Sequence, residues 1–371
     1  MTDRYQRYEL IDWFDRKKLQ KARIVVVGAG AVGNEVLKNL TLLGVGHIRV
    51  FDFDKIEVHN LTRSVLFREA DIDRYKADVA ASACRLIDPN VEILPVNMAF
   101  WQALSLEQIA ESDAVVCCVD NYEARIQLNQ LCLMTGTDFY NTGIDSRYSS
   151  VEVFPFSTYP QCACYECALP PSAYNAMQER YSCGWLQKVA YKEKRVPTTT
   201  ITSSLAGAVV ASMVLQRING HAQAPQDAVR HFQDSISLES MVSVIQRKTD
   251  CLACDEVDPL AVRLTAKRFC TCNAAFPLAD GADVEVVLSE PVLIRGTCKL
   301  CQRQQDYFQS VRQVNDAVTF CSLCGTQSVW TEFVQRLSLA EFERTFAGRN
   351  LPCKFITYHA ENRQVVVEME D

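Results

Sequence analysis

The chain has 371 residues, of which 48% are hydrophobic and 22% charged, a balance typical of a globular protein with a sizeable core. Its formal net charge of -7 argues against general binding to nucleic acid or anionic membranes, which requires clustered Lys and Arg. The first residues do not resemble a signal peptide, and the apolar stretches Ile24–Gly33 and Leu205–Leu215 are too short to span a bilayer. We therefore expect a cytoplasmic protein with no nucleic-acid and no membrane partner.

Short β-rich runs alternate with stretches of helical spacing over the first third of the chain. The expected strands are Ile24–Val27, Ile48–Phe51, Val91–Pro95 and Ala114–Val119. The expected helices between them are Val32–Leu43, Lys76–Ile87 and Tyr122–Met134. This alternation predicts an α/β domain in which helical crossovers connect the strands of a doubly wound, mostly parallel sheet.

The sequence pattern changes twice in the second half of the chain. Gly143–Pro155 is expected to be extended, whereas residues 160–200 lack periodicity and form a long irregular loop, of a length that is usually functional or disordered. An apolar helix over Thr202–Ile218 and a strand-bearing region over Pro225–Thr249 follow. Beyond Asp255 the runs become short and β-like. We therefore expect one domain over residues 1–255 and a smaller, β-rich domain over residues 256–371.

Seventeen cysteines are many for a chain without a secretory signal, and this favours metal binding over disulfides. Eight of them form four C-x-x-C pairs: Cys164/Cys167, Cys251/Cys254, Cys298/Cys301 and Cys321/Cys324. The last two pairs have the C-x₂-C-x₁₉-C-x₂-C spacing of a zinc ribbon, which lets a small domain fold around metal. The C-x-C spacing of Cys270 and Cys272 is ambiguous.

A glycine-rich turn, Gly28-Ala29-Gly30-Ala31-Val32-Gly33, directly follows the first strand and opens a helix. Such a turn lets backbone N–H groups and a helix N-terminus approach the phosphates of a nucleotide. Asp52 ends the next strand, 24 residues after Gly28, where a carboxylate can bind ribose hydroxyls. Taken alone, this pattern would suggest a protein that binds NAD or FAD.

Further motifs narrow the choice. Asp52-Phe53-Asp54 is followed by Asn60-Leu61-Thr62-Arg63, then Lys76, then Asp120-Asn121, and Arg4-Tyr5-Gln6-Arg7 precedes the first strand. In this combination residues 4–254 resemble the ThiF/MoeB and ubiquitin-activating-enzyme superfamily. The chain departs from the family pattern at one position: the family motif is often N-L-x-R-Q, whereas here Arg63 is followed by Ser64.

The resemblance implies a homodimeric enzyme that uses ATP to adenylate the C-terminal glycine of a small ubiquitin-like β-grasp protein. It implies that Arg63 and Lys76 contact phosphates, Asp120 holds Mg²⁺, Asp52 binds ribose and Arg7 reaches into the partner subunit's site. The expected nucleotide-binding set is Gly28, Gly30, Gly33, Asp52, Asp54, Asn60, Arg63, Lys76 and Asp120. The alternative for each residue is structural: Arg63 and Lys76 as ordinary surface charges, Asp120 as a helix N-cap.

The resemblance also pairs Cys164 and Cys167 with Cys251 and Cys254 in a structural zinc site, so we expect two Zn²⁺ ions in all. Within the irregular loop it points to Cys183 as the thiol that takes the acyl group as a thioester, for transfer to a conjugating enzyme. Cys162 is the second candidate. Cys84, Cys117, Cys118 and Cys132 fall on expected core elements and are more consistent with buried apolar residues.

The alternative function is an adenylyltransferase for a sulfur-carrier protein of the molybdopterin or thiamine type, which needs no thioester. Three further readings have less support. An enzyme that adenylates a tRNA base conflicts with the net charge, an inactive scaffold conflicts with the retained Arg63, Lys76 and Asp120, and a dehydrogenase explains neither these residues nor the cysteine pairs.

Overall fold

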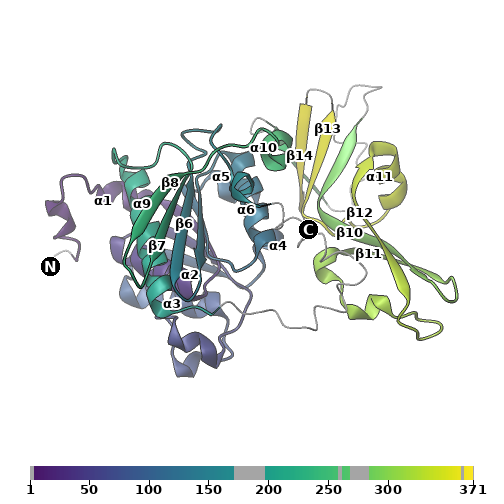
Figure 1. The fold of residues 1–371 in the computed structure, drawn as a ribbon, viewed down its shortest axis with the longest axis horizontal. Helices are drawn as coiled ribbons and strands as arrows, with labels where there is room; N and C mark the ends of the chain where they lie inside the picture. Colours follow the sequence, from purple (N-terminus) through teal and green to yellow (C-terminus); the bar gives the residue numbers. More distant parts are fainter. Residues whose placement is uncertain (1–3, 171–196, 258–260, 268–283, 361–362, 371) are drawn as a thin grey trace. The chain divides into compact units, whose positions relative to one another are not determined.

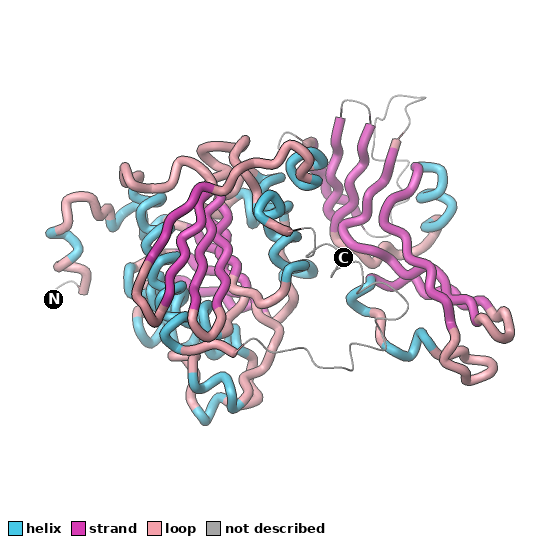
Figure 2. The backbone as a smooth tube through the Cα atoms, viewed as in Figure 1, coloured by secondary structure: helices cyan, strands magenta, loops and turns pink. Residues whose placement is uncertain are grey.

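The computed structural model describes residues 4–170, 197–257, 261–267, 284–360 and 363–370. They form two compact units, each with its own sheet (Figure 2). The first unit contains residues 4–170 and 197–257, and the second contains the described residues from 261 onward. Cys183, Cys270 and Cys272 lie outside the described residues.

The sheet of the first unit has eight strands in the order β3-β2-β1-β4-β5-β6-β7-β8. Neighbouring strands from β3 to β5 are parallel, and those from β5 to β8 are antiparallel. The strands are β1 (Arg23–Val27), β2 (His47–Phe51), β3 (Glu92–Val96), β4 (Ala114–Cys117), β5 (Phe139–Ile144), β6 (Tyr148–Phe154), β7 (Val229–Asp234) and β8 (Ser240–Val244). Because successive connections run in opposite directions from β1, the topological switch point lies between β1 and β4.

Helices pack on both faces of this sheet (Figure 1). Helices α2 and α3 lie on the same face as α9, and α5 and α6 cover the other. The helices are α1 (Arg16–Lys21), α2 (Ala31–Leu43), α3 (Lys76–Ile87), α4 (Phe100–Ala103), α5 (Leu106–Ala110), α6 (Tyr122–Thr135), α9 (Thr200–Asn219) and α10 (Leu252–Glu256). The central strands β1 and β4 are apolar because helices cover both of their faces.

Helix α9 is the element whose length the sequence analysis underestimated. Its 20 residues are long and apolar enough, by length and composition, to cross a membrane, contrary to the expectation drawn from Leu205–Leu215. Half of its most apolar window is buried, and its inner side packs on α2, where Gly207 lies against the Cβ of Glu35. In this structure α9 is therefore a core helix of the first unit.

The described part of the second unit is built on a six-stranded, mostly antiparallel sheet, in which β9 pairs in parallel with β14. The strands are β9 (Val262–Lys267), β10 (Glu285–Cys298), β11 (Gln304–Ser310), β12 (Val329–Ser338), β13 (Phe355–Ala360) and β14 (Arg363–Glu370). Helix α11 (Leu339–Phe346) places Phe342 and Phe346 on a core formed with Ile356, Tyr358 and Val367. The long strand β10 pairs with β11, β12 and β13, and so organises the unit.

The predicted fold class, a doubly wound α/β unit followed by a smaller β-rich unit with a cysteine cluster, is confirmed. The antiparallel hairpin in the first sheet was not predicted from the sequence. One extended segment was expected over Gly143–Pro155, whereas the chain forms the hairpin of β5 and β6 across that region. Phe139–Asn141 of β5 are buried on both faces and lack the alternation that marks a half-buried strand.

Candidate functional site

The turn after β1 is shaped by close packing against the end of β4. Gly28 has a φ of +97°, and a Cβ at this position would lie 2.7 Å from the carbonyl oxygen of Cys118. At Gly33 a Cβ would lie 2.0 Å from the Gly28 carbonyl oxygen. Only glycine fits either position. At Gly30, the N-cap of α2, a Cβ would meet no atom within 4 Å, so the start of the helix stays open to a phosphate.

Asp52 ties this turn to the end of β2. Its two carboxylate oxygens accept hydrogen bonds from the backbone N–H of Ala29, at 2.7 Å, and of Asp54, at 2.9 Å. Burial raises the pKa of Asp52, and the charge of Lys76 opposes this shift. A carboxylate held in this way at the carboxyl edge of β2 is placed as a ribose-binding carboxylate would be.

Lys76 begins α3 and turns its side chain back to the same edge. Its Nζ lies 2.8 Å from Oδ2 of Asp54, and its backbone N–H donates to the Asp54 carbonyl. The Lys76 side chain is 13% exposed, whereas that of Asp54 is 55% exposed. The lysine is therefore mostly buried and held in place by a partner that solvent or a ligand can reach.

The segment that carries Arg63 is held against the glycine turn by Asn34, a fully buried residue of α2. The Asn34 amide donates to the carbonyls of Ala29 and Gly30 and accepts from the N–H of Leu66. Sequence reasoning missed Asn34. Its only signal is an amide on the core-facing side of an apolar helix.

Arg63 itself C-caps the 3₁₀ helix η2 (Val58–Thr62), and its Nη1 donates to the His59 carbonyl at 2.7 Å. Asn60 stabilises the start of the same helix, because its side-chain oxygen accepts a hydrogen bond from the N–H of Glu57. Both side chains are partly buried and hydrogen-bond within their own loop. Ser64, at the position where the family often has Gln, is buried.

Asp120 follows β4 directly at the switch point. The ladder between β1 and β4 continues through the Cys118 N–H, which donates to the Val27 carbonyl at 2.7 Å. The N-cap of α6 is Asn121, whose side chain accepts the N–H of Ala124. The alternative of Asp120 as a helix N-cap is therefore wrong. Its side chain is exposed and accepts no hydrogen bond from the part of the chain that is described.

Arg7 lies away from these residues. Arg4 and Tyr5 fix the N-terminal segment to the last turn of α3, since the Tyr5 hydroxyl donates to Asp88 and Arg4 Nη1 lies 2.9 Å from the Asp88 carboxylate. Lys76 begins the same helix, about 16 Å away at a rise of about 1.5 Å per residue. The exposed Arg7 is therefore not brought to its own chain's nucleotide edge.

Cys164, Cys167, Cys251 and Cys254 come together in the first unit, with their sulfur atoms all within 4.8 Å of one another. The Cys164–Cys251 and Cys167–Cys254 sulfur distances are both 3.6 Å. Tetrahedral Zn²⁺ with bonds of about 2.3 Å requires sulfur separations of about 3.8 Å, so this group fits a closed structural zinc site. The backbone N–H of Lys248 donates to Cys167, which supports a thiolate there.

Cys298, Cys301, Cys321 and Cys324 form the corresponding cluster in the second unit. The Cys298–Cys324 sulfur distance is 3.7 Å and the Cys301–Cys321 distance is 3.5 Å. The hydroxyls of Ser328 and Thr326 contact two of the sulfurs. This cluster also fits tetrahedral zinc and closes the end of β10 on the loop before β12.

The remaining described thiols are poorly suited to nucleophilic chemistry. Cys84, Cys117, Cys132, Cys162 and Cys353 are buried, and Cys118 is partly buried. Burial raises the pKa of Cys162 to about 12, which keeps it a thiol at neutral pH and argues against it as the acyl acceptor. Cys183 lies outside the described residues.

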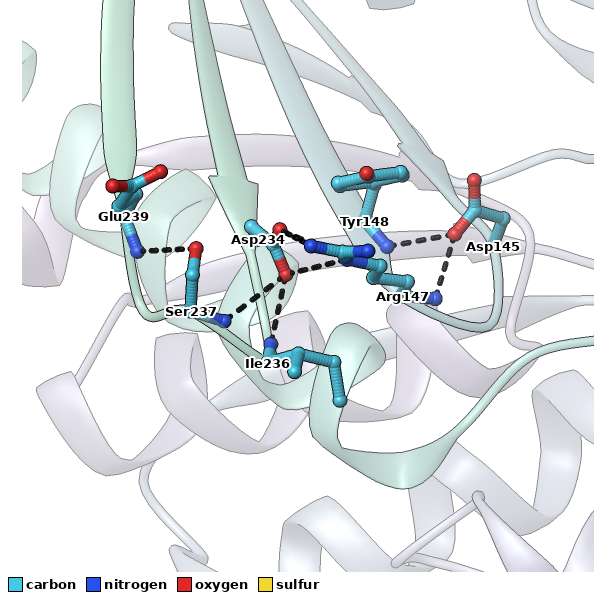
Figure 3. Close-up of polar contacts among 7 residues, drawn as sticks. All are labelled: Asp145, Arg147, Tyr148, Asp234, Ile236, Ser237 and Glu239. Carbon is cyan, nitrogen blue, oxygen red and sulfur yellow. Dashed lines mark hydrogen bonds and ion pairs between the residues drawn. The ribbon is translucent and has the colours of Figure 1, made fainter.

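An ion pair joins the β5–β6 hairpin to the β7–β8 hairpin at the carboxyl edge of β5 (Figure 3). Arg147, in the turn between β5 and β6, binds both carboxylate oxygens of Asp234, which ends β7. Asp234 also accepts the N–H groups of Ile236 and Ser237, and Asp145 accepts those of Arg147 and Tyr148. The Thr202 hydroxyl donates to the Asp145 carbonyl, so the start of α9 joins this arrangement.

Fold and site together define a nucleotide-binding α/β protein with a glycine-rich turn after β1, a buried carboxylate at the end of β2 and a lysine at the start of α3. The chain belongs to the ThiF family, whose model matches residues 4–365. The family predicted from the sequence is therefore confirmed.

The chain is 34% identical over 176 residues to the sulfur carrier protein ThiS adenylyltransferase of Bacillus subtilis, an alignment that covers 46% of this chain and 52% of that protein. It is 28% identical over 223 residues to the ubiquitin-like modifier-activating enzyme 5 of Aedes aegypti, covering 57% and 52%. The chain thus spans about half the length of these relatives.

Among solved structures, Escherichia coli MccB with succinimide has a similar fold, with a TM-score of 0.57 and 22% identity over 68% of this chain and 74% of that one. At this identity the likeness concerns the fold alone.

Proposed function

We propose that this protein adenylates the C-terminal carboxylate of a small carrier protein with ATP. A carboxylate oxygen attacks the α-phosphorus of ATP, the bond from that phosphorus to the oxygen bridging it to the β-phosphate breaks, and the electron pair leaves with pyrophosphate. The products are the carrier acyl-adenylate and pyrophosphate. The step brings two anions together, so it needs positive charge and positioning more than a general base.

The observation that carries this proposal is the position of Lys76. Its ammonium lies at the carboxyl edge of β2, beside the Asp52–Ala29 contact that marks the nucleotide end of the glycine turn. A nucleotide whose phosphates lie over Gly30 would offer them to Lys76, and Arg63 could join by releasing the His59 carbonyl. A dinucleotide-dependent dehydrogenase has no need for a lysine in this place.

Magnesium suits the same edge. Asp120 presents an exposed carboxylate at the switch point, with no hydrogen-bond donor to it among the described residues, and an oxygen ligand of this kind is what Mg²⁺ prefers. When bound with ATP, Mg²⁺ would neutralise phosphate charge. The residue that fits the role of metal ligand is Asp120.

For the class of carrier, we favour a sulfur-carrier protein, for which adenylation alone is sufficient. All the parts that the adenylation step requires belong to described residues, whereas none of the described cysteines is an exposed thiol outside the metal clusters. The B. subtilis relative bears the name of a sulfur-carrier adenylyltransferase, which supports this choice.

The second candidate continues the reaction. In it the Cys183 thiolate attacks the acyl-adenylate carbonyl, AMP leaves, and the thioester passes to a conjugating enzyme. The name of the A. aegypti relative, a ubiquitin-like modifier-activating enzyme, favours this possibility.

We also propose that the active form is a homodimer. Arg7 is exposed and fixed near the end of α3 far from Lys76, so it can serve a nucleotide site only in a second copy.

The test is ATP–pyrophosphate exchange with a panel of β-grasp proteins that end in glycine, followed by gels with and without reducing agent. Wild type and Cys183→Ala should exchange equally, with no thiol-sensitive adduct, if adenylation is the whole reaction. An adduct lost in Cys183→Ala would establish the thioester route. Absence of carrier-dependent exchange across ubiquitin-like and sulfur-carrier members alike, with ATP bound, would refute adenylation of this substrate class.

A further inference from the structure

Arg125, one turn into α6, binds three acceptors at the carboxyl edge of the sheet. Its Nη2 donates to the Val119 carbonyl at 2.5 Å, and its Nη1 donates to the side-chain oxygen of Asn141 at 2.7 Å and to the Thr142 carbonyl. All three acceptors are neutral. The guanidinium fork therefore acts as a brace between the end of β4 and the end of β5.

This brace holds the peptide that leads into Asp120. Val119 immediately precedes Asp120, so the Val119–Asp120 peptide is fixed by Arg125 on one side. On the other side the Asn121 side chain accepts the N–H of Ala124 and so ties the residue after Asp120 to the first turn of α6. The carboxylate of Asp120 has no side-chain partner in the described structure, so these backbone contacts are what orient it.

The brace itself rests on buried groups of the sheet. Asn141 is 3% exposed, and its amide donates at 2.7 Å to Glu152 of β6, which in turn accepts from Arg230 of β7. The Thr142 hydroxyl donates to the Cys117 carbonyl at 2.8 Å. The groups that hold Arg125 thus link four neighbouring strands, β4 to β7, and this limits how far Val119 can move.

From this geometry we propose that Arg125 is a positioning residue for the Mg²⁺ ligand Asp120, acting through the Val119 carbonyl. The proposal rests on the proposed function, which assigns Mg²⁺·ATP to this edge. A residue that orients a metal ligand without touching the metal commonly changes metal affinity by about 10- to 100-fold when replaced. Arg125 is expected to do so while leaving the Mg²⁺-free affinity for ATP largely intact.

The experiment is calorimetric titration of the full chain with ATP, in saturating Mg²⁺ and in chelator, with no carrier present. The readout is the factor by which Mg²⁺ tightens ATP binding, together with Tm. The variants are Arg125→Gln and Arg125→Lys. Lysine keeps the positive charge but lacks the planar fork whose two nitrogens reach separate acceptors, so it separates geometry from charge.

Asp120→Asn sets the value expected for loss of the ligand. Arg85→Gln is the matched control, because Arg85 also donates to a backbone carbonyl, that of Ile93 in the edge strand β3, at 2.5 Å. It should keep the Mg²⁺ effect of wild type.

In both Arg125 variants, we expect the factor by which Mg²⁺ tightens ATP binding to be about tenfold or more smaller than in wild type. It should approach the factor measured for Asp120→Asn. The proposal is overturned if both variants keep the wild-type factor, or if Mg²⁺-free binding falls as much as Mg²⁺-dependent binding, as a purely structural role would require. Wild-type protein that binds no ATP in either condition would overturn the proposed function and this assignment with it.

Discussion

The ammonium of Lys76 lies 2.8 Å from the carboxylate of Asp54, across the gap between the start of α3 and the segment after β2. The pair joins two residues 22 positions apart and holds the lysine at the edge of the sheet where the glycine turn opens. Since Asp54 is the more exposed partner, an incoming phosphate can replace it as the counter-ion of Lys76 without moving the helix.

Replacing Lys76 by Ala should lower carrier-dependent ATP–pyrophosphate exchange by about 10²- to 10³-fold, the usual cost of losing one preorganised charge at a developing anion. Lys55→Ala is the matched control, because Lys55 lies on the neighbouring segment with its Nζ 5.5 Å from the centre of the Tyr75 ring. Exchange in Lys76→Ala within about twofold of wild type would contradict this role.

Asp52 should give ATP binding a specific dependence on pH. Burial raises its pKa, so the carboxyl group takes up its proton at a higher pH than an exposed aspartate does. Once protonated it can no longer accept two backbone N–H groups and also serve ribose hydroxyls as a carboxylate. The advantage of wild type over Asp52→Asn in ATP affinity should therefore shrink as pH falls, starting above the ordinary carboxyl range.

Calorimetry of both proteins over the same pH series measures this advantage, and the ratio of the two affinities cancels the titration of ATP itself. A ratio that stays constant down to the ordinary carboxyl range would show that Asp52 does not titrate as its burial requires.

Two zinc ions per chain are expected by elemental analysis of the purified protein. Cys164→Ser should reduce this to about one, as should Cys298→Ser, because each removes a ligand from a different closed cluster. Cys353→Ser, a buried cysteine outside both clusters, is the control and should retain two. If either cluster variant keeps both ions, the fourfold coordination proposed for that cluster is wrong.

The Arg147–Asp234 pair should stabilise the first unit over most of the pH range. Hydrogen bonds from Arg147 hold the pKa of Asp234 well below its usual range. A carboxylate with a lowered pKa contributes stability that is present above the unfolded-state pKa and is lost as pH falls through the folded-state pKa. Asp234→Asn should therefore have a lower Tm than wild type at neutral pH, and the difference should disappear in strong acid.

Thermal unfolding across pH tests this point. Glu111→Gln, which removes the exposed ion pair with Arg23, provides the comparison and should change Tm little. Equal Tm values for wild type and Asp234→Asn at neutral pH would mean that the paired hairpins hold together without this contact.

Much of the first unit could be predicted because its helices and strands have recognisable local sequence patterns. Buried parallel strands such as Ile24–Val27 are short apolar runs, and Lys76–Ile87 and Tyr122–Met134 have helical spacing close to the observed α3 and α6. The antiparallel half was harder, since β8 is exposed along its whole length and Phe139–Asn141 of β5 are wholly buried, so neither alternates.

By itself the sequence determined the residue types whose chemistry is fixed by spacing: the glycine turn, the Asp52-x-Asp54 pair, Lys76 and the four C-x-x-C pairs. The chemical role expected of these residues depends on short-range geometry, which a local motif encodes. Only the tertiary structure decided that Asn34 joins the glycine turn to the Arg63 segment, that Asn121 and not Asp120 caps α6, and that Arg125 braces Val119. These contacts join residues through hydrogen bonds whose partners are chosen by packing, and a single sequence carries no record of which buried donor meets which acceptor.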